Sequence, residues 1–167
     1  DIAVSGAGGR DGFTEAANTW YYVWAITDNT GTSTNGLLST SSSALTLPSG
    51  FTKKRRIGAV RNDGSSNFLQ FVQEGSYAQF NNIASAMIVN QSVQTSFTTV
   101  SCAAGMPPTS NRGYFRIGSN MVADSGAYDI SLRKSGTSIS AGLDLSISSI
   151  ALGASMRHSL YGFLSTD

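Results

Sequence analysis

The densest apolar stretch of the chain covers residues 18–26 and reads NTWYYVWAI. Successive side chains of an extended strand point to opposite faces. The two faces would therefore carry Trp20, Tyr22, Trp24 and Ile26 on one side and Tyr21, Val23 and Ala25 on the other. An antiparallel strand usually leaves one face in water. This segment is apolar on both faces, so it predicts a covering layer, which can be a second sheet, a loop or another subunit.

Short segments of β-type composition alternate with turn signals along the rest of the chain. Strict alternation of apolar and polar residues at 128–133 and 143–148 indicates half-buried strands. Helical periodicity is weak throughout. Many short strands with few or no helices predict an all-β sandwich or barrel. We expect strands near 19–27, 36–40, 55–61, 67–73, 77–81, 84–91, 95–102, 113–118, 127–133, 143–149 and 159–165.

The length of 167 residues fits one domain. Glycines at four of the first twelve positions match no phosphate-binding motif, so residues 1–15 are interpreted as a flexible entry segment and residues 16–167 as a single domain. Because the chain starts at Asp1, we expect it to be a piece of a longer protein. Charged residues make up 13% of the chain, about half of the usual ~25%.

The net charge of +1 gives no overall field that would attract nucleic acid or an anionic membrane. No apolar run approaches the ~18 residues that cross a bilayer, so we expect neither nucleic-acid binding nor membrane insertion. One basic run stands out, Lys53-Lys54-Arg55-Arg56. It can be a patch for acidic polysaccharide. The favoured interpretation is a strand edge whose long side chains cover apolar surface while Ile57 and Val60 enter the core.

Candidate catalytic chemistry is sparse. His158 is the only histidine and Cys102 the only cysteine, which cannot complete a tetrahedral zinc site. Cys102 is interpreted as a small buried apolar residue. Most of the ten acidic residues stand beside Gly or Ser in turn-like sequence, where they stabilise turns. We therefore predict no catalytic residue, no metal, no cofactor and no enzymatic activity.

Aromatic side chains are the remaining candidates, because their faces stack on sugar rings. Trp20 and Trp24 lie in the middle of the apolar strand, which favours the core or a subunit interface. Residues near turns are better placed for exposure. The candidate glycan contacts are Tyr77, Phe80, Arg112 and Tyr114.

Several segments together resemble a domain that is common in bacteriophage tail-fibre and related virion surface proteins, often at their C-terminal ends. In the first half they are AANTWY (16–21), LLSTS (37–41), LPSGFTKKRRIG (47–58), RNDGSSNFL (61–69) and FVQ (71–73). In the second half they are MPP (106–108) and LYGFL (160–164). The resemblance covers the whole chain and is strongest over 16–73.

The resemblance implies a jelly-roll-like antiparallel β-sandwich on the virion, in a homotrimer near the tip that contacts the host. In that family the basic run is a fold signature rather than a site. Residues 74–113 differ most from the common pattern and are the first place to seek receptor specificity. The implied function is attachment to a bacterial surface polysaccharide. The alternatives are a structural virion component, as a trimerisation cap or capsid decoration protein, and, third, a polysaccharide depolymerase.

Overall fold

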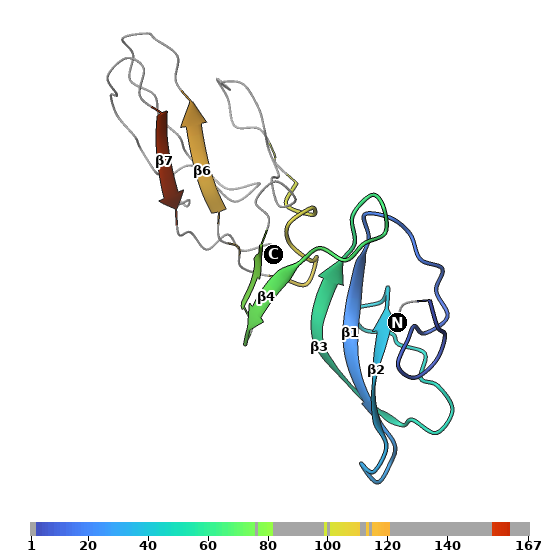
Figure 1. Cartoon of the computed structure of the whole chain (residues 1–167). Helices are drawn as coiled ribbons and strands as arrows, with labels where there is room; N and C mark the ends of the chain where they lie inside the picture. Colours follow the sequence, from blue (N-terminus) through green and yellow to red (C-terminus); the bar gives the residue numbers. More distant parts are fainter. Residues whose placement is uncertain are drawn as a thin grey trace. The chain divides into compact units, whose positions relative to one another are not determined.

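The computed structural model describes residues 3–75, 77–81, 99, 101–110, 113, 115–120 and 155–160 (Figure 1). The regular elements of this part are strands, and none is a helix. They are β1 (Trp20–Thr27), β2 (Thr34–Ser39), β3 (Lys53–Arg61), β4 (Phe71–Glu74), β5 (Tyr77–Phe80), β6 (Phe115–Asn120) and β7 (Ser155–Leu160). All pairings are antiparallel, in sheets of order β2-β1-β3, β4-β5 and β6-β7. The described part is therefore all-β and antiparallel, as predicted.

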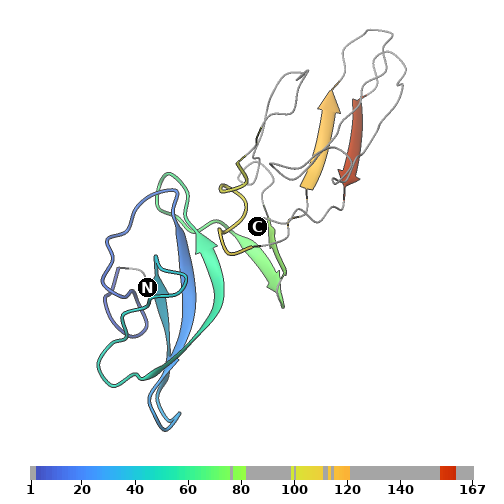
Figure 2. The ribbon, with the colours of Figure 1, turned by 180° about the vertical axis from the view of Figure 1, so that it is seen from behind.

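The chain divides into two compact units, Asp1–Thr109 and Ser110–Asp167. In the C-terminal unit, β6 and β7 pair from Phe115 with Leu160 to Asn120 with Ser155. In the N-terminal unit, β1 lies between β2 and β3 in both views (Figure 1, Figure 2). The boundary expected at residue 15 stays a prediction.

Five observed strands, β1, β2, β3, β5 and β6, lie within two residues of their predicted bounds. The strand expected at 67–73 is displaced, since β4 begins at Phe71 while Phe68 forms only an isolated bridge with Asn62. The last strand begins four residues before the predicted start at 159. The described residues of 95–102 are not in a strand. The strands expected at 84–91, 127–133 and 143–149 lie outside the described residues.

The core of the N-terminal unit lies on one face of β1. Its buried members are Tyr22, Trp24, Ile26, Leu37 and Leu45, with Ala7, Leu47, Phe51 and Ala59 packed around them. Most of the covering residues come from the connection between β2 and β3, residues 40–52. The indole Nε1 of Trp24 donates to the backbone carbonyl of Ser41, 3.3 Å away. Of the three predicted kinds of covering layer, a loop of the same chain covers this face.

Tyr21 is the most buried side chain of the opposite face, with 0% exposure. Phe13 stacks on its ring with centroids 4.8 Å apart, and Phe68 meets it edge-on at 6.4 Å. Its hydroxyl donates to the carbonyl of Ala16 and accepts from the N–H of Ala16, both at 2.8 Å. This end of the second face is thus also covered from within the chain. Further along β1, Val23 and Ala25 are only half-buried.

The entry segment is hydrogen-bonded to the sheet, whereas its composition predicts a flexible segment. It runs along β2, where the N–H of Gly8 donates to the carbonyl of Gly36 and the N–H of Leu38 to that of Gly9, both at 2.8 Å. Gly6 and Gly8 have φ of 97° and 84°, which residues with a Cβ rarely adopt. The glycines therefore serve the turns of an ordered sheet edge.

A bulge changes the faces of β3. Val23 pairs with Gly58, whereas Trp24 pairs with Arg56, so Ile57 is the extra residue. Ile57 is 55% exposed, and the prediction that it enters the core is wrong. Val60 is half-buried. The bulge places Lys54 and Arg56 on the face that carries Trp24, and Lys53 and Arg55 on the opposite face.

Candidate functional site

The exposed first half of β3 carries the highest local charge of the described chain. Residues 53–57 are all exposed, and four of them are the basic run, Lys53 to Arg56. Within the described sheet β3 is an edge strand. Alternation along the strand divides the four cations into two pairs with different surroundings.

Lys54 and Arg56 belong to the core face. The Nζ of Lys54 lies 5.8 Å from the ring centroid of Trp24, and the Cζ of Arg56 lies 5.7 Å from that of Tyr22. Cations over aromatic rings at exposed sites contribute ~0.5–1 kcal/mol each. Both also donate to carbonyls of the 40–52 connection, namely Lys54 to Leu45 at 3.4 Å and Arg56 to Ser42 at 3.1 Å. These two cations hold the covering loop on the sheet, as the strand-edge interpretation predicts.

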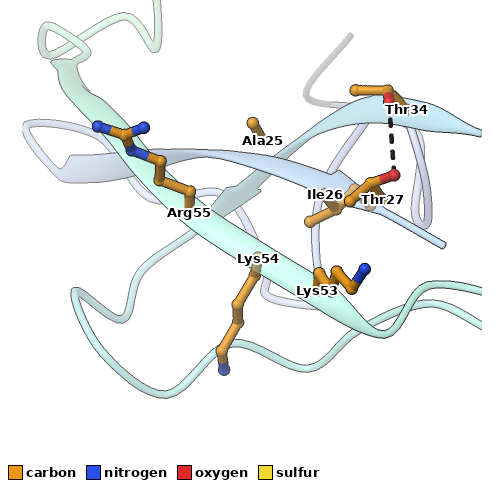
Figure 3. A pocket seen from close by; sticks show the side chains of 7 residues that line it. All are labelled: Ala25, Ile26, Thr27, Thr34, Lys53, Lys54 and Arg55. Atoms are coloured by element: carbon orange, nitrogen blue, oxygen red, sulfur yellow. Dashed lines mark hydrogen bonds between the residues drawn. The ribbon is translucent and has the colours of Figure 1, made fainter. Parts of the chain in front are cut away.

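Lys53 and Arg55 lie on the other face, beside a shallow hollow of about 200 Å³. Figure 3 shows Arg55 and Lys54 leaving β3 on opposite sides. The hollow is lined by Ala25, Ile26, Thr27, Thr34, Lys53, Lys54 and Arg55. All three strands of the sheet contribute, because Thr27 pairs with both Thr34 and Lys53, and Ala25 pairs with Arg55. The Oγ1 of Thr34 donates to the Oγ1 of Thr27 at 3.5 Å (Figure 3).

The polar groups of this hollow retain free hydrogen-bonding capacity. Lys53 donates to the carbonyl of Asn29 at 2.7 Å, which leaves two of the three ammonium N–H groups. The guanidinium of Arg55 has no hydrogen bond or ion pair with any residue in the described part of the chain. We name the group of Thr27, Thr34, Lys53 and Arg55 the basic hollow.

Asp28 is the acid next to the basic hollow along the chain, and its carboxylate is engaged in its own loop. It accepts from the Oγ1 of Thr30 at 3.0 Å and from the N–H groups of Thr32 and Ser33 at 2.9 and 3.2 Å. Partial desolvation opposes ionisation, but these hydrogen bonds together lower the pKa of Asp28. No ion pair joins a carboxylate to the basic run among the described residues. The positive charge of the hollow is therefore uncompensated there.

The aromatic candidates do not form one surface. Tyr77, 48% exposed, pairs with Glu74, and Phe80 pairs with Phe71 across the β4–β5 hairpin. Residues three apart in a strand face opposite sides. Phe80 is half-buried, with its ring centroid 6.4 Å from that of Trp20. Phe80 thus packs on Trp20, whereas Tyr77 faces the other side. Arg112 and Tyr114 lie outside the described residues.

Trp20 and Cys102 have structural surroundings. The indole Nε1 of Trp20 donates to the carbonyl of Ala103 at 2.7 Å, which holds the turn at 101–106 on the sheet. The thiol of Cys102 in this turn is half-buried, and desolvation raises its pKa. A raised pKa disfavours the nucleophilic thiolate.

The described residues contain no group of three or more His, Cys, Asp or Glu that could hold a metal ion. His158 is opposite Ile117 in the β6–β7 pairing.

Within the described part, no helix has the length and apolar character needed to span a membrane.

Sequence reasoning identified the basic run but missed Thr27 and Thr34. Thr27 ends β1 and Thr34 begins β2, so the β1–β2 turn brings the two threonines opposite each other. A strand boundary on each side of this turn is the signal that could have found them.

No protein-family model, curated protein or solved structure matches this chain.

Proposed function

We propose that this chain is a surface domain of a bacteriophage virion, carried by a tail fibre, that attaches the particle to its host by binding a bacterial surface polysaccharide. The resemblance of residues 16–73 to tail-fibre domains is the sequence argument. The structural observation in support is the exposed half of β3, where cationic side chains with unused N–H donors face solvent. The proposed role is non-enzymatic and needs no cofactor.

The proposal includes the architecture of the whole domain. We place the described antiparallel strands in a jelly-roll-like β-sandwich that assembles as a homotrimer. Three copies per fibre would raise the effective concentration of each site, so that weak contacts with a repeating polysaccharide become firm attachment. A single exposed charged contact contributes only ~0–1 kcal/mol to binding, so firm attachment requires several copies of the site.

A structural virion role is the second candidate, and exposed apolar side chains favour it. Ile57, Phe68 and Val72 are large apolar residues that stay exposed in the N-terminal unit. A neighbouring subunit in a trimerisation cap or capsid decoration protein would bury such residues. This role predicts that changes within 74–113 impair assembly and leave host range unchanged.

Binding of the labelled 167-residue chain to cells of candidate host strains, before and after removal of their surface polysaccharide, tests the proposal. Saturable binding that disappears with the polysaccharide is the expected result. Equal binding to stripped cells, or no binding to any strain, would refute glycan attachment. In the second case the structural role would stand.

A further inference from the structure

We infer that the basic hollow is the subsite for the carboxylate of an acidic sugar, such as a uronic or sialic acid residue of the host polysaccharide. This inference rests on the proposed function and narrows it to one ligand chemistry and one place. Its basis is that polar residues of three strands, Thr27, Thr34, Lys53 and Arg55, line a single recess (Figure 3).

The donors suit a carboxylate. Arg55 offers a planar fork of N–H groups with no partner among the described residues, and such a fork binds the two oxygens of a carboxylate together. Lys53 adds an ammonium held in place by Asn29. Both cations can bind the charged group, while the hydroxyls of Thr27 and Thr34 can bond sugar hydroxyls.

The size and lining of the hollow fit a sugar ring better than an ion alone. The volume of the hollow, about 200 Å³, is several times the ~30 Å³ that one water occupies in the liquid. Ala25 lies opposite Arg55 and is small and half-buried, so it leaves room for the C–H face of a ring. The hollow is open to solvent, which permits a chain of sugars to continue on either side.

The surroundings distinguish this pair of cations from its neighbours. Lys54 and Arg56 stack on rings of the core and donate to the covering loop. Of Lys53 and Arg55, only Lys53 makes a described hydrogen bond, which goes to the carbonyl of Asn29. The same run therefore provides a matched control, since Arg55 lines the hollow and Arg56 does not, and one charge can be removed from either face of one strand.

The experiment compares R55Q with R56Q in the 167-residue chain. Binding is measured by calorimetry with oligogalacturonate, oligoglucuronate and oligosialate, each beside its carboxyl-reduced form. We expect at least one acidic oligomer to bind, its reduced form to bind about tenfold more weakly, and R55Q to lose about tenfold in affinity. R56Q should stay within about threefold of the unmodified chain. Circular dichroism of each variant checks folding.

The other outcomes overturn the inference. An equal loss in R55Q and R56Q would indicate general charge attraction. Equal competition by inorganic sulfate, phosphate or a DNA oligonucleotide would show that the hollow does not select a carboxylated sugar. If R55Q still binds host polysaccharide normally, the subsite is refuted while glycan attachment stands. If the unmodified chain binds no polysaccharide, the proposed function fails with it.

Discussion

Replacing Asn62 with alanine should destabilise the N-terminal unit by about 3 kcal/mol. Asn62 comes directly after β3 and is 0% exposed. Its Oδ1 accepts from the N–H of Thr19 at 2.7 Å. Its Nδ2 donates to the carbonyl of Ala16 at 2.8 Å and to the Oε1 of Glu15 at 3.3 Å. One side chain therefore joins the chain that enters β1 to the chain that leaves β3.

The magnitude follows from what each partner loses. The N–H of Thr19 would have no acceptor in a half-buried position, which costs ~1–3 kcal/mol. The carbonyl of Ala16 keeps its bond from the Tyr21 hydroxyl. Because Ala16 is exposed and Glu15 is half-buried, water can replace the Asn62 side-chain amide as the donor to both residues. These two bonds together contribute ~1 kcal/mol.

Urea unfolding followed by tryptophan fluorescence measures the effect, because Trp20 and Trp24 lie in the same unit. Asn67→Ala is the matched control. Asn67 is exposed, and its side chain makes only a 3.5 Å contact with the Oδ2 of Asp63, so we expect a loss below ~0.5 kcal/mol. If N62A were as stable as N67A, the buried junction around Asn62 would not exist in solution.

Three further changes have defined outcomes. Hydrogen bonds from the N–H groups of Asn67 and Ser65 lower the pKa of Asp63 below its ordinary 3.8. Its ionised form therefore contributes stability above that pH, and the contribution is lost as pH falls through the lower folded value. The thermal unfolding temperature should therefore fall less steeply between about pH 5 and about pH 2 in D63N than in the unmodified chain. Parallel falls of the two unfolding temperatures would contradict this assignment. Tyr21→Phe removes the hydroxyl that bonds to Ala16 and should cost ~1–2 kcal/mol in urea unfolding, whereas no change would mean that the hydroxyl is solvated. Gly8→Ala forces a Cβ onto a residue with φ of 84° and should cost ~1–2 kcal/mol in the same assay, and a neutral result would place the turn in another conformation.

The apolar run at 18–26 predicted β1 correctly, because the run forms the central strand of its sheet and one of its faces is buried in the core. What covers it could not be read from the run. The covering residues at 40–52 are rich in Ser and Thr. They lie on the core through the apolar side chains of Leu45, Leu47 and Phe51 and through hydrogen bonds with Lys54, Arg56 and Trp24.

The faces of the basic run could not be predicted either. Four consecutive cations show no alternation, and the bulge at Ile57 changes which of them face the core. The glycine-rich start of the chain has the composition of a flexible segment, but its hydrogen bonds to β2 join residues about 28 positions apart, a distance at which composition carries no information. Asn62 stands in an Asn-Asp-Gly sequence typical of a turn, and its buried role could not be predicted because its partners, Thr19 and Ala16, precede β1.

Binding of the unmodified chain, R55Q and R56Q to purified surface polysaccharide of a susceptible host is the most direct test of attachment through β3. The account predicts saturable binding that weakens with added salt, is about tenfold weaker in R55Q and is kept in R56Q. Indistinguishable binding by all three proteins would contradict it.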